Sequence, residues 1–515
     1  MITMTRPRTN RAAMRSSLPA CIAALLAASA PTHAVTPATA GTSTDGPVMA
    51  AFRASRVAGS ASAARPPAAR AVAFAETPSS QLAGEIVVTS CADDDGFDTL
   101  RHAVLVANSG DTVNLSALPC STITLQSGAI AVGLTDLTIV GPGAGKLAIN
   151  GADADRVFSH SGLGTLTLND LTVTHGTWAA DKAYGGCIYS KGSVSLNRSV
   201  VTACTALGQS IAAGGGIVVL DALFTQLSAI TDNVASAPGI PAALSAAAGG
   251  AFAVQNVRLI RSVVSGNSAH APTGKVYGGG LVSPVALTVK YSTLSNNVAT
   301  AASTVESYGS GGAIFGSSAL TIIGSTIDHN TADVAGALVI QDNSTSTASI
   351  AMTTISSNTG NLAIGAITSP GPISILGSTI AFNTSGPLVN VAVQLGEAQL
   401  ESTIIVDNSP IDLGSDAITG GKNLIKTVSP GTVVPMDTKT QDPNLLPLAF
   451  NGGPTRTHAL GAGSPAINNG SNAANYDFDQ RGPTYRRDVG VADIGAYEVD
   501  TDHIFGTSLD FPLGF

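Results

Sequence analysis

The stretch LTIIGSTIDHN, residues 320–330, carries the pattern that decides the fold of this 515-residue chain. Apolar residues occupy its first, third and eighth positions, Ser its sixth and Asn its eleventh. The same spacing, with occasional Thr or Ala replacements, begins at residues 223, 257, 287, 320, 348 and 373, and weaker copies begin at 132, 166 and 194. These starts lie 25 to 34 residues apart, a period that indicates stacked repeats.

Glycine pairs mark the beginning of many units, as in Gly185-Gly186, Gly249-Gly250 and Gly311-Gly312. Glycine fits a corner that needs positive φ or a close backbone approach. Apolar residues two positions apart point to the same side of a strand, and neighbouring strands lie about 4.8 Å apart. The sequence therefore predicts an all-β solenoid, a parallel β-helix over residues 85–436, in which equivalent residues lie directly above one another.

The closing asparagines would form a column of their own. An Asn at a corner can bond its amide to the next Asn, and it tolerates the left-handed conformation of a sharp bend. We therefore expect a structural polar ladder and not a functional site. Its members are Asn233, Asn267, Asn297, Asn330, Asn358 and Asn383.

The first 34 residues have the features of a secretory signal peptide. Four arginines precede an apolar run from Leu18 to Ala30, and Thr32-His33-Ala34 is a small-x-small cleavage site. Cys21 raises the alternative of a lipoprotein, which we disfavour because the apolar run follows this Cys. No other run approaches the roughly 18 apolar residues of a spanning helix. We expect an exported protein without a transmembrane segment, outside the cell or on a bacterial surface.

The net charge of the chain limits the kinds of molecule that it can bind. The formal net charge is -9, and removal of the four arginines in the signal peptide would make it about -13. An acidic chain without basic clusters is a poor candidate for binding nucleic acid. We expect a monomer with no nucleic-acid partner and no cofactor.

Four cysteines would remain after export, and three pairings of them are possible. Cys91–Cys120 with Cys187–Cys204 is favoured because it keeps both loops short. Metal binding is the alternative, but these cysteines form no CxxC pair and no His cluster accompanies them.

Other segments differ from the repeats in composition. Residues 35–84 are rich in Ala, Pro, Thr and Ser, which predicts a flexible linker. In TLRHAVLVAN, residues 99–108, apolar residues have helical spacing, so a short helix is expected to cover the first coil. Residues 437–500 are rich in Pro and Gly and are expected to cover the far end, with a tail at 501–515.

Two parts of the chain resemble known bacterial proteins. The corner Gly311-Gly312-Ala313-Ile314 and the ending Ile380-Ala381-Phe382-Asn383 resemble polymorphic outer membrane protein repeats. Residues 442–498, with DQRG at 479 and DIGAYE at 493, resemble the C-terminal segment of secreted choice-of-anchor Q proteins. The resemblance implies a right-handed parallel β-helix at a bacterial surface or outside the cell, and it implies no known reaction.

Enzymes that cleave polysaccharides also use parallel β-helices, and glycoside hydrolysis needs two carboxylates about 5 to 9.5 Å apart. The three outward columns that begin at Ser195, Asn197 and Val200 contain no carboxylate, and the last of them is rich in threonine and suits surface contact. Asp232 and Asp328 lie three coils apart. We therefore expect no catalytic residue and no metal site. A lyase or hydrolase with its site in the loops 235–249, 268–278 and 298–310 is the alternative.

Further polar residues have structural interpretations. Asp93, Asp94 and Asp95 are consecutive and point in different directions, so a solvated loop is expected and not a calcium site. The charged residues of the C-terminal segment are expected to lock loops through charge-assisted hydrogen bonds. These residues are Arg456, His458, Asp479, Arg481, Asp493 and Glu498.

Tyrosines precede three of the glycine corners, beside charged residues. Exposed tyrosines suit contact with sugars or peptides, because the ring has an apolar face and a polar tip. The alternative is that they pack over the glycine backbone. The candidate ligand-binding residues are Tyr184, Tyr277, Tyr308, Lys182 and Lys275. The sequence thus predicts a non-catalytic protein for adhesion, surface display or contact with a glycan or another cell-surface ligand.

Overall fold

The computed structural model describes residues 83–238, 244–304, 306–316, 319–341, 348–487 and 490–499. All of them belong to one compact unit, Ser62–Phe515. The expected signal peptide, all but the last two residues of the expected linker, and the expected tail lie outside the described residues. The boundaries of these segments stay predictions.

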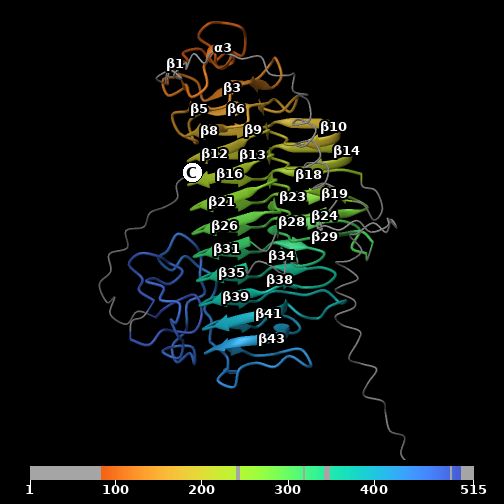
Figure 1. Cartoon of the computed structure of the whole chain (residues 1–515), viewed down its shortest axis with the longest axis vertical. Helices are drawn as coiled ribbons and strands as arrows, with labels where there is room; N and C mark the ends of the chain where they lie inside the picture. Colours follow the sequence, from red (N-terminus) through yellow and green to blue (C-terminus); the bar gives the residue numbers. More distant parts are fainter. Residues whose placement is uncertain are drawn as a thin grey trace, which may run out of the picture. The chain divides into compact units, whose positions relative to one another are not determined.

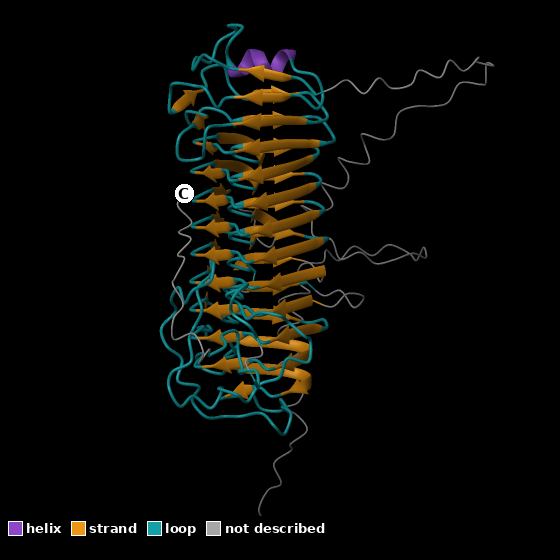
Figure 2. Cartoon of the chain, turned by 90° about the vertical axis from the view of Figure 1, so that its left-hand side faces the viewer, coloured by secondary structure: helices purple, strands orange, loops and turns teal. Residues whose placement is uncertain are grey.

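Within these ranges the strands of successive coils pair in parallel and form sheets of 22, 12 and 10 strands, called here sheets A, B and C (Figures 1 and 2). Most coils give sheet A two short strands separated by a bend. The first strands are β4 (Ile130–Val132), β7 (Phe158–His160), β11 (Ile188–Ser190), β15 (Ile217–Val219), β20 (Ala251–Ala253), β25 (Leu281–Ser283), β30 (Ile314–Gly316), β34 (Leu338–Ile340) and β38 (Ile367–Ser369). The second strands are β1 (Glu85–Val87), β2 (Thr112–Asn114), β5 (Leu137–Val140), β8 (Thr165–Asn169), β12 (Ser193–Asn197), β16 (Ala222–Gln226), β21 (Asn256–Ile260), β26 (Ala286–Lys290), β31 (Ala319–Ile323), β35 (Ala348–Ala351) and β39 (Ile373–Leu376). In the last two coils the two strands merge into β41 (Val393–Glu401) and β43 (Leu413–Gly421).

Successive coils then turn into sheet B, and the coils that contain β9 (Thr172–Thr174) to β36 (Thr354–Ser356) continue from there into sheet C. Sheet B consists of β3 (Thr122–Thr124), β6 (Ala148–Asn150), β9 (Thr172–Thr174), β13 (Val200–Thr202), β17 (Ala229–Thr231), β22 (Val263–Ser265), β27 (Thr293–Ser295), β32 (Thr326–Asp328), β36 (Thr354–Ser356), β40 (Thr379–Ala381), β42 (Ile404–Val406) and β44 (Leu424–Ile425). Sheet C consists of β10 (Thr177–Tyr184), β14 (Thr205–Ala213), β18 (Val234–Ser236), β19 (Leu244–Ala247), β23 (Ser268–His270), β24 (Lys275–Tyr277), β28 (Val298–Thr300), β29 (Tyr308–Ser310), β33 (Thr331–Ala332) and β37 (Thr359–Gly360).

The expected stacking of equivalent residues is confirmed by the register of sheet A. Val194 pairs with Leu166 on one side and with Leu223 on the other, and the column continues through Val257, Leu287 and Leu320. All of these side chains are buried. The all-β parallel solenoid that the repeat predicts is therefore the fold of this chain.

One helix, α3 (Leu100–Val106), is present in the described part of the chain, and it covers the first coil (Figure 2). Thr99 caps its N-terminus by accepting a hydrogen bond from the backbone N–H of His102. Leu100, Ala103 and Val104 are buried against the end of the solenoid. No helix in the described ranges has the length and hydropathy required to span a bilayer.

The repeat asparagines lie in one buried column at the turn between sheets B and C. The Nδ2 of Asn267 donates to the Oδ1 of Asn297 at 2.9 Å, and each of the other repeat asparagines makes the same bond to the next coil. Asn408 extends the column, and its Nδ2 donates to Asp412. A second donor proton of each amide bonds a backbone carbonyl, such as Val264 for Asn297. This polar column is thus fully bonded inside the solenoid.

Both short-loop disulfides are present. Cys91 bonds Cys120, with their Cα atoms 6.3 Å apart, and Cys187 bonds Cys204, with theirs 5.4 Å apart. Cys204 occupies the Asn position of its coil, and its backbone N–H donates to the Oδ1 of Asn233. The second disulfide therefore takes over one position of the asparagine column and links it to the glycine corner.

Residues 442–499, the C-terminal segment, lie against the side of sheet B, whereas the sequence predicted a cover for the far end (Figure 1). The Oγ1 of Thr326 donates to the carbonyl of Arg456, and that of Thr354 donates to Gln480, both at 2.6 Å. The backbone N–H of Ala496 donates to Thr379 at 3.0 Å. These three threonines are buried, so the prediction of a threonine face free for surface contact is wrong for these coils.

Candidate functional site

Sheet C forms a wall whose strands run outward from the asparagine turn and return to the glycine corner, as β18 and β19 or β28 and β29 do. The described residues of the loops 235–249, 268–278 and 298–310 belong to these excursions. Small side chains fill the interior of the wall, among them Ala183, Ala206, Ala246 and Ala269. Alanine allows the outgoing and returning strands to pack closely, and the returning strands carry the predicted tyrosines.

Two of these tyrosines are less exposed than the sequence suggested. Lys275 pairs in register with Tyr308, whereas Tyr277 pairs with Ser310. Lys275 and Tyr308 are buried, and burial raises the pKa of Tyr308 to about 12. Tyr277 stacks on Phe315 with 4.2 Å between ring centroids, and burial raises its pKa as well. The prediction of an exposed Tyr308 ring beside an exposed Lys275 is therefore wrong, because both side chains pack inside the wall.

The wall formed by sheet C packs on a second apolar layer outside the solenoid. It consists of outward-facing residues of the first strands of sheet A, which we call the seam: Tyr189, Val218, Phe252, Val282, Phe315 and Val339. All of these except Tyr189 are buried. The signal was present in the sequence, since Ile217-Val218-Val219 and Ala251-Phe252-Ala253 are apolar throughout, as strands buried on both faces are.

The seam ends at Tyr189, where the neighbouring position of β7 is Ser159. A cluster of large, partly exposed side chains gathers here. The guanidinium of Arg156 lies 3.7 Å from the ring centroid of Trp178 and 5.3 Å from that of Tyr189. Its Nη2 donates to the carbonyl of Tyr184 at 2.8 Å and its Nε to that of Gly185 at 3.2 Å. We call Arg156, Trp178, Tyr184 and Tyr189 the Trp178 cluster.

The Trp178 cluster combines aromatic surface with positive charge. Burial lowers the pKa of Arg156 to about 10, so the guanidinium is still charged at neutral pH. Nη1 of Arg156 has no acceptor within the described residues, and Lys182 on the same strand as Trp178 is exposed. The sequence identified Tyr184 and Lys182, but it did not indicate Arg156, Trp178 or Tyr189, which come from three different strands or turns.

Two carboxylates of the loops and corners, Asp333 and Asp328, have structural partners. Asp333 accepts hydrogen bonds from the backbone N–H groups of Ala301 and Gly309 and from Ser303, at 2.5 to 3.0 Å, and so holds the loop 298–310 in place. Asp328 accepts from Arg456 and from His329. Glu306 is exposed. In the described loops these acids form no pair of facing carboxylates.

Asp93 is buried, which corrects the expectation that it belongs to a solvated loop. Its carboxylate takes two hydrogen bonds from Arg101, at 2.8 and 2.9 Å, and the backbone N–H groups of Gln126 and Ser127. These bonds outweigh desolvation and lower the pKa of Asp93. Among the described residues no group of three or more His, Cys, Asp or Glu is arranged to hold a metal ion.

The charged residues of the C-terminal segment bond one another and the loop backbone. Arg481 donates to Asp479 through Nε and Nη2, and Glu498 accepts from Arg487 at 3.3 Å and from the backbone N–H of Asp493 at 2.9 Å. Burial raises the pKa of Glu498 to about 8. Asp493 in turn accepts from the backbone of Asn468 and Val499. These bonds join residues 468, 479–481, 487 and 493–499 of the irregular segment.

Comparison with known proteins identifies no relative by sequence. No protein-family model matches this chain, and no curated protein sequence matches it. Among solved structures, the crystal structure of pectate lyase Pel9A is similar, with a TM-score of 0.37 and 13% identity over 81% of this chain and 96% of that one.

Proposed function

We propose that this protein is an exported, non-catalytic protein that contacts acidic glycans through the Trp178 cluster. The observation that carries the proposal is the partly exposed guanidinium of Arg156, held 3.7 Å above the ring of Trp178 and close to Tyr189. It is supported by the position of Lys182, exposed on the same strand as Trp178.

The chemistry of the cluster suits a carboxylated or sulfated sugar chain. Aromatic rings offer an apolar face to the C–H groups of a sugar and a polar tip for its hydroxyls. A guanidinium recognises a planar carboxylate through two parallel hydrogen bonds, and Nη1 of Arg156 still has a donor available. The backbone carbonyls of Tyr184 and Gly185 fix the orientation of this guanidinium, so little side-chain entropy is lost on binding.

The test is binding of the full chain to acidic and neutral polysaccharides, measured by affinity electrophoresis. Trp178→Ala is expected to weaken binding to the acidic polysaccharides by about tenfold or more. Lys182→Gln is expected to weaken it less and to reduce its dependence on salt, because Lys182 is exposed and screened. Phe224→Ala is the matched control, since Phe224 is an exposed aromatic on sheet A outside the cluster. Equal binding by wild type and Trp178→Ala would remove the proposal.

The alternative proposal is a polysaccharide lyase or hydrolase that acts in the long loops of sheet C. The same protein and polysaccharides test it, with unsaturated products and reducing ends as the readout. Glu306 is the exposed acid of these loops, so Glu306→Gln would abolish turnover if this alternative holds. Turnover that Glu306→Gln abolishes would replace the binding proposal.

We also propose a place for this chain among secreted bacterial β-helix proteins of the choice-of-anchor Q and polymorphic outer membrane protein repeat type. The sequence of residues 442–498 supports this proposal. An adhesive role at the outer membrane or cell surface belongs to the same proposal. The two disulfides are consistent with export to an oxidising compartment. Surface labelling of intact cells that express the full chain tests the location.

A further inference from the structure

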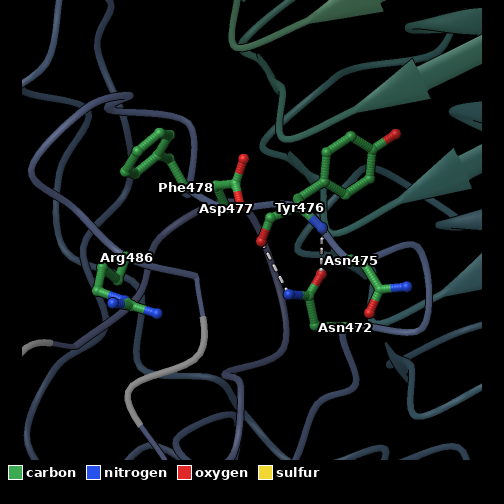
Figure 3. A pocket seen from close by; sticks show the side chains of 6 residues that line it. All are labelled: Asn472, Asn475, Tyr476, Asp477, Phe478 and Arg486. Atoms are coloured by element: carbon green, nitrogen blue, oxygen red, sulfur yellow. Dashed lines mark hydrogen bonds between the residues drawn. The ribbon is translucent and has the colours of Figure 1, made fainter.

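A pocket of about 380 Å³ opens in the C-terminal segment, on the part of the chain that no sequence motif assigned to ligand binding. Its volume is within the range of small-molecule sites. Figure 3 shows Arg486 and Phe478 on one side of it, Asn472 and Asn475 on the other, and Asp477 between them. Tyr476 completes the lining.

Local hydrogen bonds hold both walls of the pocket. Nδ2 of Asn472 donates to the carbonyl of Tyr476 at 2.8 Å, and its Oδ1 accepts from the backbone N–H of the same residue at 2.9 Å (Figure 3). Phe478 and Arg486 form an antiparallel bridge that fixes the opposite wall. The adjoining Asp479 and Gln480 are buried and bonded to Arg481 and to Thr354, so the wall is anchored to the solenoid.

Three polar side chains that line the pocket take no part in the hydrogen bonds that hold its walls. The side chains of Asn475, Asp477 and Arg486 make no hydrogen bond or ion pair with any described residue, and the guanidinium of Arg486 is directed toward the middle of the view in Figure 3. Asp477 and Arg486 are not within ion-pair distance of each other. The pocket thus presents an acceptor, a donor and an amide that is both, next to the apolar surface of Phe478.

We propose that this pocket binds a neutral hexose unit. Sugar hydroxyls donate and accept, which matches Asp477, Arg486 and Asn475 together, and the C–H face of the ring matches an aromatic side chain. The negative charge of Asp477 balances the positive charge of Arg486. A ligand with a net charge would therefore be repelled by one of these two side chains. The inference is independent of the Trp178 cluster, which shares no residue with the pocket.

Ligand-observed saturation-transfer NMR on the full chain tests the proposal. The probes are the methyl glycosides of glucose, galactose and mannose, with glucuronate and glucosamine as charged comparators. Asp477→Asn, Asn475→Gly and Arg486→Gln are each expected to weaken binding of the preferred glycoside by about tenfold. Gly is chosen because Asn475 has a φ of 52°. Arg258→Gln, at an exposed position of β21, is the matched control for Arg486→Gln.

The outcomes separate the possibilities. The site is supported if wild type gives a saturation-transfer signal from a neutral glycoside and each of the three pocket variants gives a weaker one. The thermal midpoints of the variants must equal that of the wild type. Absence of any neutral signal, equal signals from wild type and all three variants, or a stronger signal from a charged comparator overturns it. Trp178→Ala is expected to leave the signal unchanged, so loss of polysaccharide binding with a retained glycoside signal would count only against the proposed function.

Discussion

Nε2 of His458 lies 2.9 Å from the hydroxyl of Ser356, although 102 residues separate them in the chain. Nδ1 of the same ring lies 2.7 Å from the carbonyl of Leu446. A carbonyl only accepts, so Nδ1 carries the proton and Nε2 accepts from Ser356. Both side chains are buried, and burial lowers the pKa of His458. This neutral imidazole fastens the C-terminal segment to β36.

Removal of the Ser356 hydroxyl should loosen this attachment. Ser356→Ala leaves Nε2 buried without a donor, which costs about 1 to 3 kcal/mol. We expect faster proteolysis within residues 442–499 and a lower urea midpoint. The matched control is Ser265→Ala, in the same column of sheet B three coils earlier and partly exposed. Equal proteolysis of both variants would contradict the attachment.

The stability of the protein should fall as the pH rises from 7 to 8, because of Glu498. Its pKa is about 8 in the folded protein and near 4.5 without burial. Between pH 4.5 and 8 the carboxyl of Glu498 is therefore protonated in the folded protein and ionised in the unfolded one. The free energy of unfolding then decreases with pH, by at most about 1.4 kcal/mol per unit. His458 has a lowered pKa and acts in the opposite direction below about pH 6.5, outside this window.

Glu498→Gln should remove most of this slope, since Gln resembles the protonated acid. The measurement is the free energy of unfolding in urea at pH 7.0, 7.5 and 8.0. Glu397→Gln, at an exposed position of β41, should keep the slope of the wild type. An unchanged slope in Glu498→Gln would show that Glu498 is ionised throughout.

Loss of one asparagine from the buried column should destabilise the protein strongly. Asn297 donates to Asn330 and to the carbonyl of Val264, and it accepts from Asn267. Asn297→Ala leaves these buried partners unsatisfied, at a cost of about 2 to 4 kcal/mol. Asn197→Ala removes a similar bond to Asn169 from the partly exposed face of sheet A, and we expect a cost below about 1 kcal/mol.

Hydrogen exchange of the Asn297→Ala variant locates the damage. Faster exchange should concentrate in the coils next to residue 297, because each coil of a solenoid contacts mainly its neighbours. Equal stability of the two Asn variants would argue against the column as a source of stability.

The disulfide between Cys187 and Cys204 should contribute about 3 kcal/mol, as expected for the loop of 17 residues that it closes. Cys187→Ala with Cys204→Ala should therefore lower the thermal midpoint while the coil is retained by its hydrogen bonds. The pair Cys91 and Cys120 closes a loop of 29 residues, for which chain entropy predicts a loss larger by only about 0.5 kcal/mol. Midpoints unaffected by either double substitution would contradict the entropic estimate.

Much of the architecture was predictable because it repeats. Leu287, Ser292 and Asn297 recur at the same spacing in successive coils, and parallel pairing at a fixed strand separation stacks such equivalents. The short disulfide loops and the helix that covers the first coil were predictable for a related reason, since both depend on contacts near in sequence.

The candidate sites were predictable only in part. Tyr184 and Lys182 were found because tyrosines precede the glycine corners, but Tyr308 aligns with Lys275 and not with Tyr277. The loops of sheet C differ in length from coil to coil, so their register does not follow from the repeat. No sequence pattern indicated the pocket at Arg486, because the irregular segment that forms it contains no repeat.

By itself, the sequence determined the stacked coils. Its repeated apolar residues are buried, and its repeated asparagines are all hydrogen-bonded, only when successive coils stack in register. Only the tertiary structure decided that residues 442–499 lie on the threonines of sheet B and that Arg156 meets Trp178. The reason is physical. Stacking depends on equivalent residues one coil apart, whereas these contacts join different segments whose complementarity exists only after the chain has folded.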